Sequence, residues 1–198
     1  MSHAMSDDER VERTLAAIDA ANAGDPSRDA GGEPEALVYG RRMSAALTAL
    51  RPGAGPALRI AARAQHVERW KIPRASYPQG RAGYLRWRAD LGRMHAERAA
   101  EIARAEGWDE GTVERVAQIV AKKQLRSDED AQTLEDCACL VFLEHALDAF
   151  AREHEDAKVI AILQKTWAKM SEEGRRAALA LPLSPRARAL VGQALAGS

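Results

Sequence analysis

Apolar residues recur along this chain at intervals of three and four positions, the spacing that places side chains on one face of an α-helix. Val11, Leu15 and Ile18 form such a stripe after an acidic first turn, and residues 109–125 repeat the pattern. No segment alternates apolar and polar residues as a half-buried strand would. The pattern therefore predicts seven to nine helices and an all-α fold, arranged as a helical bundle.

Segments rich in glycine and proline separate the predicted helices. Pro73, Pro78 and Gly80 exclude a regular helix from residues 71–81, and the aromatic residues nearby predict that this loop is ordered and packed. Residues 128–150 form the most apolar segment, which we expect to be the central helix. The expected helices cover residues 7–23, 34–50, 56–70, 83–106, 109–125, 128–150, 156–169, 172–181 and 185–195.

The composition favours a single domain. The chain has 198 residues, of which 46% are hydrophobic, enough to bury the core of one domain of ordinary size. We assign residues 7–198 to this domain and regard residues 1–6 as a disordered or non-native extension. No signal-peptide pattern opens the chain and no apolar run reaches membrane-spanning length. We therefore expect a cytoplasmic protein that does not engage a membrane.

The charges of the chain balance, with 29 basic and 29 acidic residues, so no global field draws the protein to nucleic acid. Residues 59–104, however, contain 11 Arg or Lys residues against 4 acidic ones, interleaved with Trp70, Tyr77, Tyr84 and Trp87. Such a segment could bind phosphates and stack on bases. The other interpretation is that the arginines lie on solvated helix faces while the aromatic residues anchor the loop, and the zero net charge favours this one.

Histidines and carboxylates in the predicted helices are candidate metal ligands. His66, His95 and His145 lie in helical segments, and Glu135 and Asp136 lie in the most apolar one. Imidazole and carboxylate groups are usual ligands for zinc, iron and manganese. Neither an H-x-x-x-H nor an H-E-x-x-H motif is suitably placed, which favours histidines that are simply hydrogen-bonded or partly exposed. The chain also lacks a glycine-rich phosphate loop and a G-x-S-x-G motif.

Four segments resemble the domain of unknown function 4202 family. They are residues 61–70 (AARAQHVERW), 72–74 (IPR), 77–81 (YPQGR) and 134–144 (LEDCACLVFLE). The similarity extends over nearly the whole chain. This family has no established activity, so the resemblance implies kinship without implying a function.

The order of the helices is also similar to that of the HD-domain metal-dependent phosphohydrolases. In that superfamily a first histidine, a His-Asp tandem and a final aspartate bind one or two metal ions. His66 matches the tandem histidine, Asp136 the final aspartate and His95 an accessory histidine. Val67 stands in place of the tandem aspartate and Tyr39 in place of the first histidine. The resemblance therefore implies an HD-like bundle that could hold manganese, iron or zinc, but with an incomplete ligand set that favours no tightly bound metal.

Our first functional hypothesis is a protein that binds a phosphorylated small molecule or nucleotide in an HD-like cleft. Arginine and lysine supply positive charge there, and arginine can bind a phosphate through two hydrogen bonds. The expected ligand-binding residues are Arg63, Lys71, Arg74, Tyr77 and Arg81.

Two alternatives stay open. The first is an enzyme, a metal-dependent phosphohydrolase in which His66, His95 and Asp136 bind the metal and Glu135 acts as an acid or base. The second is a helical module that binds another protein. Under the first two hypotheses His66, His95 and Asp136 should come together, and we expect Asp136 to pair with a histidine or an arginine rather than with a tightly bound metal.

Overall fold

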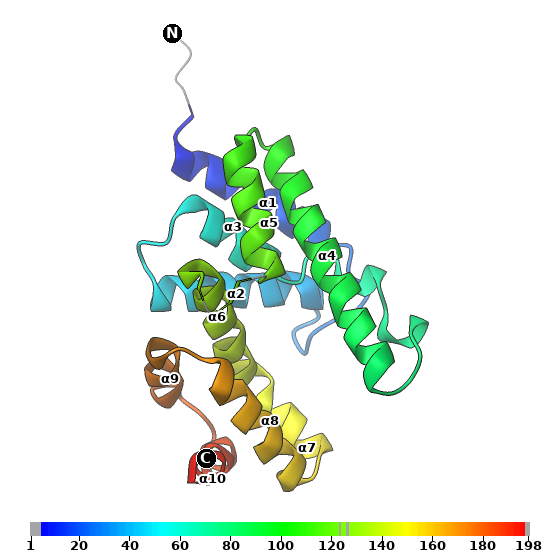
Figure 1. Ribbon diagram of the computed structural model, residues 1–198, viewed down its shortest axis with the longest axis vertical. Coiled ribbons are helices and arrows are strands. Elements are labelled where there is room, and N and C mark those ends of the chain that lie inside the picture. Colours follow the sequence, from blue (N-terminus) through cyan, green and yellow to red (C-terminus); the bar gives the residue numbers. More distant parts are fainter. Residues whose placement is uncertain (1–4, 123, 126, 197–198) are drawn as a thin grey trace. The chain divides into compact units, whose positions relative to one another are not determined.

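The computed structural model describes residues 5–122, 124–125 and 127–196. These residues form ten α-helices and two short 3-10 helices, and no strand occurs among them (Figure 1). The all-α prediction is confirmed, the predicted number of helices was too low, and the HD-like arrangement stays a prediction. The α-helices are α1 (Asp7–Asn22), α2 (Glu35–Leu50), α3 (Pro56–Ala64), α4 (Arg81–Ala105), α5 (Glu110–Ala121), α6 (Glu129–His145), α7 (Leu147–Glu153), α8 (Asp156–Lys169), α9 (Glu172–Leu179) and α10 (Pro185–Ala196), and the 3-10 helices are η1 (Arg69–Lys71) and η2 (Arg74–Ser76).

Helix α3 ends at Ala64, six residues earlier than the sequence pattern indicates. The side-chain oxygen of Asn22 accepts the backbone N–H of Glu68 at 3.0 Å. Glu68 has a φ of +53°, in the left-handed region, where a right-handed helix cannot continue. The predicted helix over residues 128–150 is also divided, because the backbone changes conformation at Ala146 between α6 and α7.

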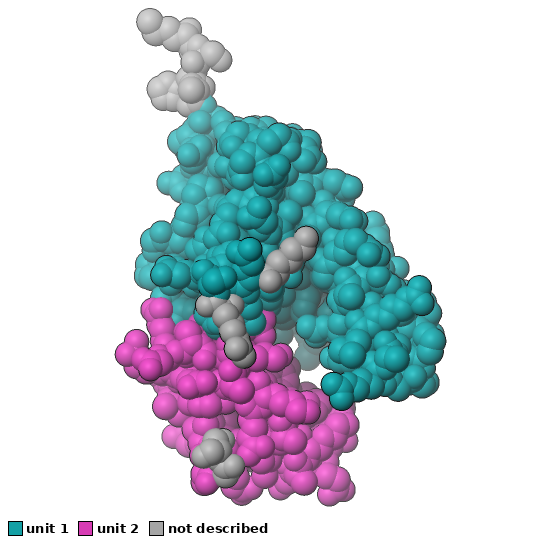
Figure 2. Space-filling view, in the orientation of Figure 1, with its two compact units in different colours: residues 1–134 teal, residues 135–198 magenta. Residues whose placement is uncertain are grey.

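The chain forms two compact units, residues 1–134 and residues 135–198, coloured separately in Figure 2. Unit 1 is organised around α3, which packs against α1, α2 and α5. Helices α2 and α3 approach each other closely at Gly40 of α2. A Cβ atom at this position would lie only 2.9 Å from the carbonyl oxygen of Arg63 in α3. Five residues of α3 are buried, namely Leu58, Ile60, Ala61, Ala62 and Ala64.

Unit 2 contains most of α6 and the helices α7 to α10. Helix α10 packs against α7 and α8. Leu190 of α10 is buried, as are Val159 and Leu163 of α8. The expectation of a single domain over residues 7–198 stays a prediction. In the described part of the chain, no helix combines the length and the apolar character needed to cross a membrane.

Candidate functional site

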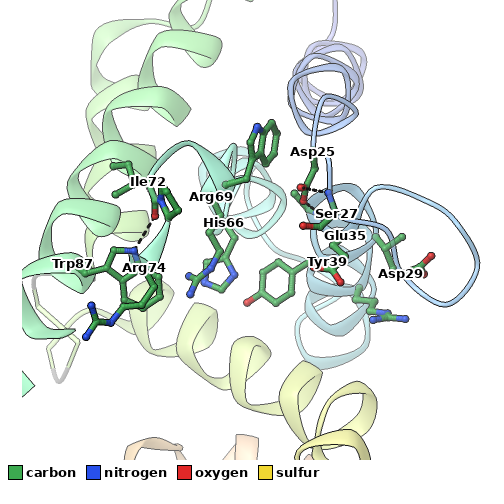
Figure 3. Close-up of a pocket in the computed structure, with 15 residues that line it drawn as sticks. Asp25, Ser27, Asp29, Glu35, Tyr39, His66, Arg69, Ile72, Arg74 and Trp87 are labelled. Atoms are coloured by element: carbon green, nitrogen blue, oxygen red, sulfur yellow. Dashed lines mark hydrogen bonds between the residues drawn. The ribbon is translucent and has the colours of Figure 1, made fainter. Parts of the chain in front are cut away.

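Unit 1 contains a cavity of about 430 Å³. One wall comes from the loop after α1 and from α2, between Asp25 and Arg42. The other comes from the segment His66 to Arg74, with Trp87 of α4. In Figure 3, Asp25, Glu35 and Asp29 lie on one side of Tyr39, and His66, Arg69 and Arg74 lie on the other. The cavity therefore has two walls of different chemistry.

The acidic wall is built around backbone hydrogen bonds. The Asp25 carboxylate accepts the N–H of Ser27 and that of Ala36, both at 2.9 Å, so it caps the first turn of α2 from outside the helix. Asp29 likewise accepts the N–H groups of Gly31 and Glu33. These two carboxylates thus already accept hydrogen bonds that stabilise the loop, which leaves fewer of their acceptor positions open to a ligand.

The basic wall is held in place by contacts on both sides. The carboxylate of Glu68 accepts from Lys71 Nζ at 2.8 Å and from Arg98 Nε at 3.0 Å. The indole N–H of Trp87 donates to the carbonyl of Ile72 at 2.9 Å. These contacts fix the chain on either side of Arg69, whose side chain lies in the cavity.

Three arginines line the cavity and are half-buried: Arg42, Arg69 and Arg74. Arg74 donates to the carbonyl of Tyr77, and the guanidinium of Arg69 lies 4.9 Å from the ring centre of Trp87. Within the described ranges, none of the three arginines forms an ion pair. Burial lowers the pKa of Arg69, as expected of a cation that lacks a counter-charge. The cavity lining thus holds three arginines that form no ion pair with a described residue, together with three carboxylates, Asp25, Asp29 and Glu35.

Two histidines lie next to each other at this site, and one of them, His66, lines the cavity. The ring of His66 stacks on Tyr39 with the ring centres 4.3 Å apart, and it lies 5.6 Å from the ring of His95. Nδ1 of His95 is 2.8 Å from the carbonyl oxygen of Val67, so Nδ1 carries the proton and Nε2 is an acceptor. That Nε2 atom is buried and has no hydrogen-bond partner in the described structure.

Both histidines are neutral near pH 7. Burial lowers the pKa of His66 well below its ordinary value of 6.5, and the positive charge of Arg69 lowers it further. Burial likewise lowers the pKa of His95 to about 4. Neutral imidazole can bind a metal ion, but the cations of Arg69, Arg88 and Lys122 act on His66 and would repel one. The local charge is better suited to an anion.

The structure brings His66 and His95 together, while Glu135 and Asp136 belong to unit 2. The Asp136 carboxylate accepts the backbone N–H of Ser171 at 2.9 Å and also its hydroxyl, and Glu135 pairs with Lys169 at 3.6 Å. Within the ranges that the structure describes, no three His, Cys, Asp or Glu side chains form a group that could hold a metal. The joint metal site of His66, His95 and Asp136, and the acid or base role of Glu135, stay predictions.

The other residues expected to bind the ligand have different surroundings. Arg63 pairs with Asp19 at 2.7 Å, and Lys71 pairs with Glu68. The hydroxyl of Tyr77 donates to Asp90 at 2.8 Å. None of these three side chains lines the cavity. Their roles in ligand binding stay predictions.

Arg74 and Arg81 complete the predicted set. Arg74 lines the cavity beside His66, whereas Arg81 is exposed at the start of α4. The sequence interpretation did not select Arg42 or Arg69. Arg42 follows Tyr39 by three positions on α2, a spacing that places both on one helix face, but no sequence signal distinguishes an unpaired arginine from a paired one.

The family model described as Domain of unknown function (DUF4202) matches residues 12–191. No curated protein and no solved structure matches the chain. The match spans both compact units, and it agrees with the resemblance found in residues 61–81 and 134–144. The comparisons do not extend this kinship to the HD-domain phosphohydrolases.

Proposed function

We propose that this chain, which belongs to the DUF4202 family, binds a phosphorylated small molecule or nucleotide in the cavity of unit 1, in the cytoplasm. The observation that carries the proposal is the set of three half-buried arginines, Arg42, Arg69 and Arg74, which form no ion pair with any described residue. A cation that is partly removed from water is costly unless an anion compensates it. A bound phosphate would supply that compensation.

The guanidinium group also suits phosphate by its shape. Its planar array of N–H donors can form two parallel hydrogen bonds to phosphate oxygens, and such charged bonds are stronger than neutral ones. Arg69 is additionally held over the ring of Trp87, which restricts its motion before a ligand arrives. A side chain positioned in advance loses less conformational entropy on binding.

The remaining lining suits the organic part of such a ligand. Tyr39, Trp70 and Trp87 contribute aromatic surface, and Ile72 and Pro73 contribute aliphatic surface. The volume of about 430 Å³ lies in the range of small-molecule sites. A compound with an anionic group and an aromatic or sugar portion therefore matches both the charge and the apolar surface.

The adjacent rings of His66 and His95 support one second candidate, a metal-dependent phosphohydrolase. That function would require Asp136 as a third metal ligand and Glu135 as an acid or base. Phosphatase turnover that depends on manganese and disappears in Asp136→Asn would favour this candidate over simple binding.

Isothermal titration calorimetry with AMP, ribose 5-phosphate and inorganic phosphate tests the proposal. The variant Arg69→Gln should raise the Kd of any compound that binds by about tenfold or more, because it removes a charged hydrogen-bond donor. Arg59→Gln is the matched control, since Arg59 already pairs with Asp8 and Glu12 away from this cavity. Absence of saturable binding, or equal weakening in both variants, would contradict the proposal.

A further inference from the structure

Positive charge continues beyond the cavity along the first turns of α4. Residues 81–93 contain four arginines and one aspartate, although the whole chain has no net charge. Arg93 pairs with that aspartate, Asp90, at 2.8 Å. Arg81, Arg86 and Arg88 are exposed and form no ion pair with a described residue. This part of α4 therefore carries a local excess of positive charge.

Arg81, Tyr84, Leu85 and Arg88 occupy one face of α4, because their spacings of three, four and seven positions return to the same side of a helix. Tyr84 is 44% exposed and Leu85 is 54% exposed, two of the most exposed large apolar side chains in the described structure. We call these four residues the α4 face. It offers an aromatic ring and an aliphatic surface between two guanidinium groups.

The α4 face adjoins the cavity. The ring centre of Tyr84 is 5.8 Å from that of Trp87. Trp87 lines the cavity, and the guanidinium of Arg69 lies over the Trp87 ring. Arg88 directly follows Trp87 on the helix and acts electrostatically on Arg69. In Figure 1 these first turns of α4 lie beside the loop that precedes the helix. Arginines without an ion-pair partner among the described residues, and aromatic surface, thus continue from the cavity onto α4.

We propose that the ligand of this site is the 5′-phosphorylated end of a single nucleic-acid strand, whose terminal nucleotide occupies the cavity while the following nucleotide lies on the α4 face. This inference rests on the proposed function. A terminal phosphomonoester carries more charge than an internal phosphodiester, which suits the three arginines of the cavity. Arg81 and Arg88 then contact the next phosphate, and Tyr84 stacks on a base.

A nucleic-acid strand fits these observations better than an acidic peptide does. Phosphate and base alternate along a strand, as guanidinium and aromatic groups do on the α4 face, and stacking on an aromatic ring accepts any base. Arg81 and Arg88 are seven positions apart, or about 10 Å along the helix. The α4 face can therefore contact only a short stretch of a nucleic-acid strand. The zero net charge of the chain is compatible with such a local contact.

The test compares AMP with a tetra-adenylate RNA that carries a 5′-phosphate, using calorimetry on the full chain. We expect the tetranucleotide to bind about tenfold more tightly than AMP, because it adds a phosphate contact and a stacked base. Its affinity should also fall more steeply with salt, by about one to two further units in the slope of log affinity against log salt concentration. The same strand with a 5′-hydroxyl should bind more weakly.

Three variants locate the contacts. The double variant Arg81→Gln/Arg88→Gln should reduce the affinity for the tetranucleotide to nearly that for AMP, and it should change the affinity for AMP far less than Arg69→Gln does. Arg69→Gln should weaken both ligands. Arg104→Gln is the matched control on the same helix, because Arg104 pairs with Glu110, and it should change neither affinity.

The outcomes separate this inference from the proposed function. If AMP and the tetranucleotide bind equally, or if the double variant has no effect, the strand proposal is overturned while the cavity proposal stands. If neither ligand saturates, both are overturned. Equal binding of a short poly-glutamate peptide would also overturn the strand proposal, because it would show recognition of charge alone.

Discussion

Two cavities of nearly equal size lie in unit 1, and each is lined by three arginines. The first, of about 430 Å³, contains Arg42, Arg69 and Arg74. The second, of about 410 Å³, lies between α1, α2 and α3 and is lined by a different set. Size and arginine content therefore do not distinguish them. The three arginines of the second cavity are Arg51, Arg59 and Arg63.

The difference lies in charge compensation. Arg59 pairs with two carboxylates of α1, Arg63 pairs with Asp19, and Arg51 lies 3.8 Å from Asp130. The arginines of the first cavity have no such partners among the described residues. A paired arginine already has an anion beside it, whereas an unpaired, half-buried arginine can still bind one. We therefore interpret the second cavity as a structural network and the first as a binding site.

His95, which lies next to His66 at the first cavity, should give the largest effect. The pKa of His95 is lowered from 6.5 to about 4 in the folded protein, so between these values the unfolded chain binds a proton that the folded chain does not. The contribution of His95 to the free energy of unfolding is therefore fully present above about pH 6.5, and about 3 kcal/mol of it is lost as the pH drops to 4. Urea denaturation at pH 7 and pH 4 should show this loss in the native chain and a smaller one in His95→Gln. Equal losses in the two proteins would contradict the prediction.

Gly83→Ala should disturb the first cavity through its loop. A Cβ atom at Gly83 would lie 1.9 Å from the carbonyl oxygen of Pro78, so the loop before α4 must move. We expect a loss of roughly 2 to 3 kcal/mol in the free energy of unfolding, measured by chemical denaturation, together with weaker AMP binding. The control Gly92→Ala meets no atom within 4 Å and should instead stabilise the helix by about 0.5 to 1 kcal/mol. An unchanged free energy of unfolding in Gly83→Ala would show that the loop can move at little cost.

Asp19→Asn should make the second cavity resemble the first. It leaves Arg63, whose side chain is only 14% exposed, without its counter-charge. The free energy of unfolding should fall by roughly 1 to 2 kcal/mol. Added inorganic phosphate should then raise the melting temperature of the variant more than that of the native chain. An unchanged stability would mean that charge pairing does not distinguish the two cavities.

Arg42→Gln should have the smallest effect on stability. Because Arg42 forms no ion pair with a described residue, its removal should change the free energy of unfolding by less than about 0.5 kcal/mol. Binding of a phosphorylated ligand should nevertheless weaken, as calorimetry can measure. A large loss of stability would place Arg42 in the structural network instead of the binding site.

The local pattern of the sequence was sufficient for the fold class and for most helices. Spacing of three and four residues depends only on the geometry of one helix, so the stripe of α1 and the proline breaks before α4 could be recognised without tertiary information. The end of α3 could not. It depends on Asn22, which lies 46 residues before the Glu68 N–H that it accepts.

The candidate site shows the same division. The sequence by itself determined that arginines and aromatic residues concentrate between residues 59 and 104, and that His66 and His95 lie within that region. Only the tertiary structure decided which arginines are paired, because the partners are far apart along the chain: Arg63 and Asp19 are separated by 44 residues. Whether a charge is compensated depends on how close an opposite charge lies in space. The Coulomb energy of two charges falls with that distance, whatever their separation in the sequence.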